Sequence, residues 1–217
     1  MNLPTVYIVD DDAGVRESLG TLLEIAGMRV SPHASAEAFL AACGPEPVGC
    51  MVLDVRMPGM DGLALQAELA RQGIRLPIIF LTAYADIPMT VEAMRGGAAD
   101  FLTKPVNGAA FVERVKAVLE RHIELRDAEA NRRQFQQRLE KLTAREREVL
   151  NLALAGKQNK EIALLLHISH RTIEAHRSRI FLKTGVNSLL ELARLASAAG
   201  IEFANAAGWP EADDRTS

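Results

Sequence analysis

The sequence predicts a protein of the α/β class, in which a doubly wound, five-stranded parallel sheet is joined by a helical linker to an all-α domain of four helices. Over residues 4–122, short aliphatic and β-branched runs alternate five times with amphipathic stretches, which favours parallel strands with right-handed crossovers. Over residues 142–200, the apolar residues follow helical spacing alone. No glycine or proline interrupts the chain from Phe111 to Gly156, so we expect a long helix between the two domains.

In the front half, strands are expected near residues 5–9, 28–33, 50–53, 77–82 and 100–103, each followed by a helix; the fourth helix should span residues 86–96. Residues 50–53 are apolar throughout, as is typical of a strand buried on both faces of a parallel sheet. Ser35, Asp61 and Asn107 can cap the helices that follow them, because their side-chain oxygens accept hydrogen bonds from first-turn amides. These elements place the front domain at residues 1–122.

Polar side chains stand at the carboxyl ends of four of the five strands: Asp10, Asp11 and Asp12 after the first, Asp54 after the third, Thr82 after the fourth and Lys104 after the fifth. Asp12 can alternatively serve as a helix cap. If the others converge, the repulsion between their carboxylates calls for a cation, and oxygen ligands of this kind favour Mg²⁺. A hydroxyl and an ammonium beside them suit the oxygens of a phosphoryl group.

Charge is distributed unevenly along the chain. Residues 1–106 hold 7 Lys and Arg against 13 Asp and Glu, whereas residues 142–200 hold 9 against 5. An acidic front and a basic back predict two domains with different partners, the second of them a polyanion. The two cysteines suggest neither a disulfide framework nor a zinc site, and the sequence shows no signal peptide and no apolar run long enough to span a membrane. We therefore expect a cytoplasmic protein.

The linker, residues 123–141, is charged and rich in Gln. Ala128, Phe135, Leu139 and Leu142 recur near heptad spacing, which fits either a short coiled coil in a dimer or a solvated helix with one apolar edge. Residues 201–217, which include Trp209 and acidic ends, are expected to form a largely disordered tail.

The back half begins with a capping box formed by Thr143 and Glu146. A second helix follows over residues 159–166, then a short turn, and then a basic third helix over residues 169–183. A helix, a tight turn and a second helix with basic side chains predict a helix-turn-helix, whose second helix suits the major groove of DNA.

As a set, the motifs of the front half resemble the receiver domain of two-component response regulators, which has a CheY-like fold. They are Val9-Asp10-Asp11-Asp12, the segment from Leu53 to Gly62, Leu81-Thr82-Ala83 and Phe101-Leu102-Thr103-Lys104-Pro105. The resemblance implies that Asp54 accepts a phosphoryl group from a sensor histidine kinase. It further implies Mg²⁺ ligands at Asp11, Asp54 and the Arg56 carbonyl, with Asp10 acting largely through water, and phosphoryl contacts from Thr82 and Lys104.

The same resemblance implies a switch made of Thr82 and Phe101, although Phe101 alone is also consistent with an ordinary core residue. The switch would alter the face of residues 86–103, with Val91, Met94 and Arg95 as candidate dimer contacts. The stretch from Asp86 to Val91 is similar to the FixJ subgroup of regulators.

The back half resembles the LuxR-type helix-turn-helix through Leu142-Thr143-Ala144-Arg145-Glu146, the segment from Asn159 to Ala163, and the segment from Arg171 to His176. The resemblance makes residues 169–183 the recognition helix and assigns residues to two groups. Base edges would be read by Glu174, Ala175 and Ser178, and phosphates would be contacted by Lys160, Thr172, Arg177, Arg179 and Lys183.

Together these features predict a regulator of the FixJ/NarL type: a phosphorylation-controlled, DNA-binding transcription factor that turns over no external substrate. Its partners would be a sensor histidine kinase, double-stranded promoter DNA and, on phosphorylation, a second copy of the chain on paired half-sites. An alternative coupling is the release of an occluded DNA-binding domain. An alternative function is a magnesium-dependent phosphatase of the haloacid-dehalogenase type with Asp10 as nucleophile; it leaves the Asp54 motif and the basic domain unexplained.

Overall fold

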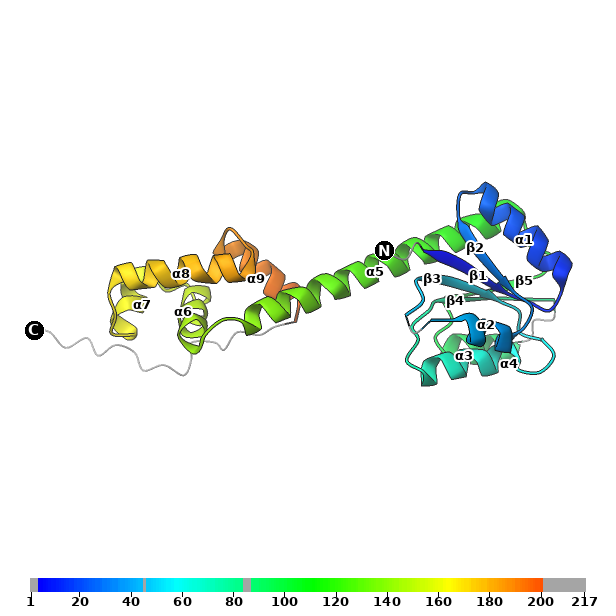
Figure 1. Ribbon diagram of the computed structural model, residues 1–217, viewed down its shortest axis with the longest axis horizontal. Coiled ribbons are helices and arrows are strands. Elements are labelled where there is room, and N and C mark those ends of the chain that lie inside the picture. The colour runs from blue at the N-terminus through cyan, green and yellow to red at the C-terminus, as the bar shows by residue number, and fades with distance from the viewer. Residues whose placement is uncertain (1–3, 45, 84–86, 201–217) are drawn as a thin grey trace, which may run out of the picture. The chain divides into compact units, whose positions relative to one another are not determined.

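The computed structural model describes residues 4–44, 46–83 and 87–200 (Figure 1). The chain divides after Arg126 into two compact units. The predicted tail with Trp209 and the expected start of the fourth helix at Asp86 lie outside the described residues. None of the described helices has both the length and the apolar character that crossing a membrane requires.

The described residues of the first unit contain a five-stranded parallel sheet with the order β2-β1-β3-β4-β5. Its strands are β1 (Thr5–Val9), β2 (Arg29–His33), β3 (Gly49–Leu53), β4 (Ile78–Thr82) and β5 (Asp100–Thr103). The helices are α1 (Ala13–Ile25), α2 (Ala36–Ala42), α3 (Gly62–Arg71), α4 (Ile87–Arg95) and α5 (Gly108–Glu140). The doubly wound α/β prediction is confirmed. The strand order reverses direction between β1 and β3, and ligand sites of such sheets lie at the carboxyl ends of the strands at this point.

Two hydrophobic cores cover the two faces of the sheet (Figure 1). Strand β3 serves both, because its side chains alternate: Met51 and Leu53 face α2, α3 and α4, whereas Cys50 and Val52 face α1 and α5. All five residues of β3 are buried, as are those of β4. This is why the sequence of β3 reads as a continuous apolar run, and why the polar residue that follows it stands at a fixed place.

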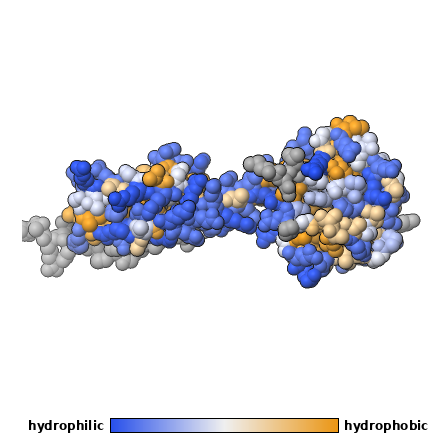
Figure 2. Space-filling view, viewed as in Figure 1, coloured by the Kyte–Doolittle hydropathy of each residue, from blue (hydrophilic) through white to orange (hydrophobic). Residues whose placement is uncertain are grey.

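The second unit is all-α. After α5 it contains α6 (Ala144–Leu154), α7 (Asn159–Leu165), α8 (His170–Thr184) and α9 (Leu189–Ala198), which confirms the four-helix prediction for residues 142–200. Its core also includes Phe135 and Leu139 from the end of α5. The apolar residues that recur near heptad spacing in the linker are therefore used, at this end, for packing within one chain. In Figure 2 the middle of α5 presents a predominantly hydrophilic surface.

Helix caps define the start of α6 and both ends of the basic helix α8. Thr143 and Glu146 form the predicted capping box at the start of α6, with both reciprocal hydrogen bonds present. Ser169 caps α8 by accepting a hydrogen bond from the amide of Thr172, and Gly185 ends α8 in the left-handed conformation. The two ends of the basic helix are therefore fixed by local hydrogen bonds.

Candidate functional site

Three carboxylates gather at the carboxyl ends of β1 and β3. These strands are neighbours with Val9 opposite Leu53, so the next residues, Asp10 and Asp54, come side by side. Oxygens of Asp10, Asp11 and Asp54 lie within 4.8 Å of one another. Asp10 and Asp54 are 2% and 8% exposed, whereas Asp11 is open to solvent. The cluster is thus buried on its inner side and accessible on its outer side.

Lys104 joins the two buried carboxylates. Its Nζ donates to Asp10 Oδ2 at 2.6 Å and to Asp54 Oδ2 at 3.1 Å. Lys104 follows β5 immediately, and its peptide bond to Pro105 is cis. Strand ends that are far apart in sequence therefore deliver four charged groups to one place, as the sequence motifs suggested.

Burial and charge act against each other in this group. Burial raises the pKa of the Asp10 carboxyl above its ordinary value, although Lys104 and the amide of Asp12 oppose the shift. Burial likewise disfavours the charge of Lys104, but hydrogen bonds and charges from Asp10 and Asp54 outweigh it and raise the pKa of the ammonium. Lys104 is therefore held as a cation.

The donor set fits a hard divalent cation. Three carboxylates contribute a formal charge of −3 against +1 from Lys104, which leaves an excess of −2. Carboxylate oxygens gathered in this way are ligands that Mg²⁺ accepts, usually together with several waters and phosphate oxygens. Asp11 is open to solvent, so water can reach the cluster from this side.

The loop after β3 is closed around Asp54. The amide of Arg56 approaches Asp54 Oδ1 at 3.4 Å, and the amide of Gly62 donates to the Val55 carbonyl at 2.9 Å. A Cβ at Gly62 would lie 2.3 Å from the Asp54 carbonyl oxygen, so glycine permits this close approach. Asp61 caps α3 by accepting from the amide of Ala64. Local chemistry thus fixes the backbone that follows the candidate phosphoacceptor.

Thr82 and Phe101 lie on the adjoining strands. Thr82 ends β4 and is 1% exposed, and its carbonyl accepts from the amide of Lys104 at 2.8 Å. Phe101 lies opposite Phe80 in the β4–β5 pair, with 6.1 Å between ring centroids, and it is only half-buried. Thr82 therefore stands beside the Lys104 backbone, and Phe101 stands nearer the surface than a fully buried core residue.

Helix α4 presents apolar side chains to solvent. Val91 and Met94 are 41% and 47% exposed, and Arg95 is also exposed. Ile87, which was not among the predicted face residues, is the most exposed of these apolar side chains at 81%. Exposed apolar residues gathered on one helix are a feature of interaction surfaces.

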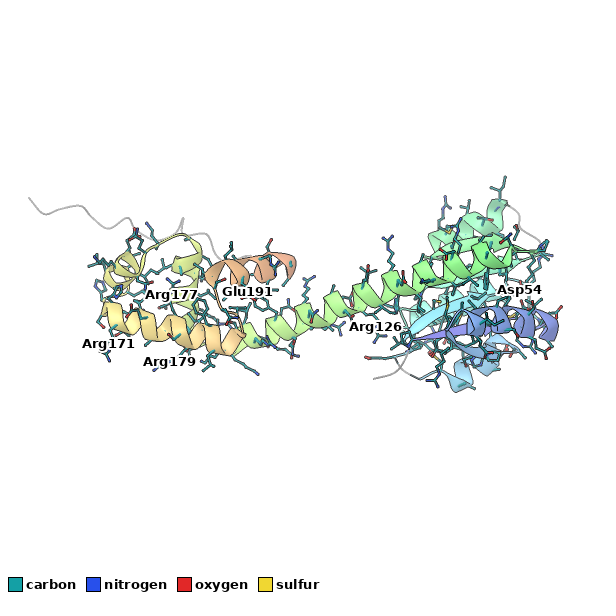
Figure 3. All side chains as sticks on the ribbon, turned by 90° about the horizontal axis from the view of Figure 1, so that it is seen from above. Asp54, Arg126, Arg171, Arg177, Arg179 and Glu191 are labelled. Carbon is teal, nitrogen blue, oxygen red and sulfur yellow. The ribbon has the colours of Figure 1, made fainter. Side chains whose placement is uncertain are left out.

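The predicted recognition helix is α8, and its basic residues differ in how free they are (Figure 3). Residues Glu174, Ala175, Ser178 and Arg179 are exposed on α8, as is Lys160 on α7. Arg177 is half-buried and donates to Asn159 Oδ1 at 2.7 Å. Lys183 donates to Glu146 Oε2 at 2.6 Å and to the Lys141 carbonyl at 3.3 Å. Thr172 shares a hydrogen bond with Ser169.

These hydrogen bonds within the protein show which of the predicted phosphate-binding residues have free side chains. Arg179 and Lys160 have side chains open to a ligand. Arg177 and Lys183 already hold helices of the second unit together, so binding DNA would require them to share or exchange these partners. Lys183, with two hydrogen-bond partners inside the second unit, is the least available of the predicted phosphate-binding residues.

Three positions near the sites were not singled out for these contacts from the sequence. Arg16 donates from Nη1 to the Asp10 carbonyl at 2.6 Å, and Glu37 accepts from the amide of Met60 at 3.0 Å. Glu146 was assigned to the capping box alone, whereas its carboxylate also pairs with Lys183. The contacts of Glu37 and Glu146 join residues 23 and 37 positions apart, so no local pattern could have revealed them, whereas Arg16 lies only six residues from Asp10.

An acidic, lysine-containing site at the strand ends, followed by a helix-turn-helix with a basic second helix, defines a class of signalling proteins that join a receiver-type site to a DNA-binding unit. The comparisons with known proteins agree. Residues 6–116 match the response regulator receiver domain, and residues 140–196 match the luxR family of bacterial regulatory proteins.

Curated relatives and solved structures cover nearly the whole chain. The transcriptional regulatory protein FixJ of Azorhizobium caulinodans is 46% identical over 90% of this chain and 93% of its own length. TdiR of Thauera aromatica is 44% identical over 88% and 84%. The response regulator StyR has a structure with a TM-score of 0.81 at 43% identity, covering 90% of this chain and 99% of that one. Full-length FixJ from B. japonicum has a TM-score of 0.58 at 40% identity, covering 92% and 98%.

The chain belongs to the response regulators of the FixJ type, with a receiver domain and a LuxR-type DNA-binding domain. It is a DNA-binding transcriptional regulator of the two-component class. These matches give no support to the phosphatase alternative with Asp10 as nucleophile.

Proposed function

We propose that Asp54 accepts a phosphoryl group from a phosphohistidine of a sensor histidine kinase, and that the modified receiver domain changes promoter binding by the second unit. The observation that carries this proposal is the shared position of Asp10, Asp54 and Lys104, with Asp11 at the open side. A cytoplasmic location, where the protein would meet both kinase and DNA, belongs to the same proposal.

In the transfer, an Asp54 oxygen forms the new P–O bond while the P–N bond to the donor imidazole breaks, and the leaving nitrogen retains the electron pair. Lys104 and Thr82 bind the phosphoryl oxygens, where a partly buried cation and a hydroxyl stabilise the charge that develops. Asp11, Asp54 and the Arg56 carbonyl would hold Mg²⁺, and Asp10 would act largely through water. When bound, this ion offsets the repulsion between the carboxylates and the incoming phosphoryl group.

The signal leaves the site through Thr82 and Phe101. Thr82 moves toward the phosphoryl group, and the half-buried ring of Phe101 turns into the vacated space. The exposed face of α4, with Val91, Met94 and Arg95, then becomes the contact between two receiver domains. A single small helical module buries only about 600–1,000 Å² on DNA, so two recognition helices on paired half-sites bind more tightly than one.

The DNA interface of the proposal is the exposed side of α8. Glu174, Ala175 and Ser178 face base edges. Lys160, Thr172, Arg177, Arg179 and Lys183 contact phosphates, with Lys160 and Arg179 the least engaged within the protein.

Intact-mass analysis tests the acceptor assignment. After treatment with acetyl phosphate and Mg²⁺, the full-length protein should gain the mass of one phosphoryl group. The addition should be lost in Asp54→Asn. It should persist in a variant of a surface acid remote from the site, such as Glu24→Gln.

An unchanged mass gain in Asp54→Asn would contradict the proposal. If Asp10→Asn then abolishes that gain, Asp10 is the nucleophile, as in the phosphatase alternative.

A further inference from the structure

The loop that follows Asp54 is tied to a helix from an earlier part of the chain. Glu37 lies in the first turn of α2, and its Oε1 accepts a hydrogen bond from the amide of Met60 at 3.0 Å. Gly59, just before it, has φ +77°, and a Cβ there would stand 2.9 Å from the same Oε1 atom. The loop therefore turns closely around the Glu37 carboxylate.

Only a few residues separate the Glu37–Met60 hydrogen bond from the proposed metal site in the loop after Asp54. Val55 and Met57 are buried, and the Val55 carbonyl accepts from the amide of Gly62, so both sides of the loop are anchored in the protein. Arg56, whose carbonyl is a proposed Mg²⁺ ligand, lies between the two buried residues. The tip of the loop at Met60 is fixed from outside by Glu37.

We propose that Glu37 is a positioning residue for the metal site: its carboxylate holds the Met60 amide and so sets the backbone of residues 56–60, including the Arg56 carbonyl. The inference rests on the proposed Mg²⁺ site. The loop backbone is the ligand-bearing element, and Glu37 acts on the ion through it.

The protonation state of Glu37 in the folded protein suits this positioning role. Hydrogen bonds from its own amide, from the amide of Met60 and from Ser35 lower the pKa of the Glu37 carboxyl, so it is ionised at neutral pH. A carboxylate accepts a backbone N–H more strongly than a neutral oxygen does. Partners of this kind, one step removed from a metal, typically alter metal affinity about 10–100-fold when they are lost.

Three substitutions of Glu37 separate the effect of its side-chain length from the effect of its charge. Glu37→Gln keeps an oxygen at the same distance and removes the charge, whereas Glu37→Asp keeps the charge and shortens the side chain. Glu37→Ala removes both. Glu24→Ala, an exposed acid in the last turn of α1, removes the same charge elsewhere.

Two measurements on the full-length protein apply. The first is amide hydrogen exchange of residues 56–60 without metal. Exchange should be clearly faster in Glu37→Ala and Glu37→Asp, and intermediate in Glu37→Gln, whose neutral oxygen has the same reach but accepts more weakly than a carboxylate. The second is calorimetric titration with Mg²⁺ alone, in which Ala and Asp should weaken binding about tenfold. Glu24→Ala should match wild type in both.

The outcomes are distinguishable. Unchanged exchange and Mg²⁺ affinity in Glu37→Ala and Glu37→Asp would overturn the positioning role. So would a loss in Glu37→Gln that equals the loss in Glu37→Ala, because an acceptor oxygen of the same reach would then contribute nothing to holding the Met60 amide. If wild-type protein binds no Mg²⁺, the proposed function fails, while the exchange data still decide whether Glu37 holds the loop.

Discussion

Asp10 and Asp54 each follow a strand directly, yet their neighbours give them different properties. Asp10 is the more buried, and its oxygens accept from Lys104 and from the amide of Asp12. Asp54 shares Lys104, and the Arg56 amide approaches its other oxygen from a longer distance. Asp54, the less enclosed of the two carboxylates, is therefore the better placed to attack the phosphorus of an incoming phosphoryl group. The proposed choice of Asp54 over Asp10 as phosphoacceptor therefore rests on the hydrogen bonds of single atoms.

Gly49 offers a prediction at this scale. It begins β3 with φ +144°, and an added Cβ would stand 1.8 Å from the Thr5 carbonyl oxygen. Gly49→Ala should lower the free energy of unfolding by more than about 3 kcal/mol, because strain and a clash with backbone combine.

The matched control is Gly44→Ala, since a Cβ at Gly44 would meet nothing within 4 Å. It should change the free energy of unfolding by less than about 0.5 kcal/mol. Denaturant unfolding followed by circular dichroism measures both variants. Equal midpoints for the two variants would show that the β1–β3 contact tolerates a side chain.

At the scale of elements, the basic helix α8, whose ends are capped locally, is also bound to its neighbouring helices by side-chain contacts. Lys183 near its end pairs with Glu146 of α6, and Arg177 in its middle bonds to Asn159 of α7. Two of the basic side chains thus hold the helix in its place. The others, among them Arg171 and Arg179, are exposed along it (Figure 3). One helix thereby combines packing contacts with exposed basic side chains.

The Glu146–Lys183 pair predicts a pH dependence. Burial opposes ionisation of Glu146, but hydrogen bonds from Lys183 and Thr143 outweigh it, so the pKa of the carboxyl lies below its ordinary value. Its ionised form therefore stabilises the fold above the ordinary carboxyl pKa, and this contribution is lost as the pH falls through the lowered value. Glu146→Gln should reduce the opening free energy of α6 by about 1–2 kcal/mol at about pH 7, and by less near about pH 4.

Hydrogen exchange of the α6 amides across this pH range measures the effect. Glu161→Gln is the control. Like Glu146, Glu161 completes a capping box, in this case that of α7, but its ion pair with Lys157, at 3.6 Å, is exposed to solvent. A Glu146→Gln effect that does not vary with pH would show that the ion pair contributes nothing.

At the scale of the whole molecule, the two units carry opposite charge and one long helix runs from the first into the second. Residues 1–106 are acidic and residues 142–200 are basic, and α5 spans Gly108–Glu140. The acidic unit houses the proposed Mg²⁺ and phosphoryl chemistry, and the basic unit suits DNA phosphates. Either dimerisation or release of the second unit could couple them, and the exposed apolar side chains of α4 favour dimerisation.

Sedimentation with and without acetyl phosphate and Mg²⁺ distinguishes these couplings. Phosphorylation should shift the wild-type protein from monomer toward dimer, and Met94→Glu should keep the phosphorylated protein monomeric, because a charge would be buried in the contact. Ile25→Glu is the control: Ile25 is equally apolar and 80% exposed, but it lies on α1. If the phosphorylated wild type remains a monomer while its DNA affinity rises, release of the second unit is the coupling.

The sequence by itself determined the elements, their order and the kinds of chemistry they carry. The apolar run before Asp54 predicted a doubly buried strand, and the Thr143–Glu146 pair predicted a helix start, because both depend on neighbours within a few residues. Motifs at the strand ends predicted which side chains would gather, since parallel strands end at a common edge.

Tertiary structure alone decided which atoms meet. It gave Lys104 both Asp10 and Asp54 as partners, gave Lys183 to Glu146, and placed Glu37 against the loop at Met60. It also used Phe135 and Leu139 within the second unit's core. These contacts join residues far apart along the chain, and they depend on how helices and strands pack, which no local pattern of residues records.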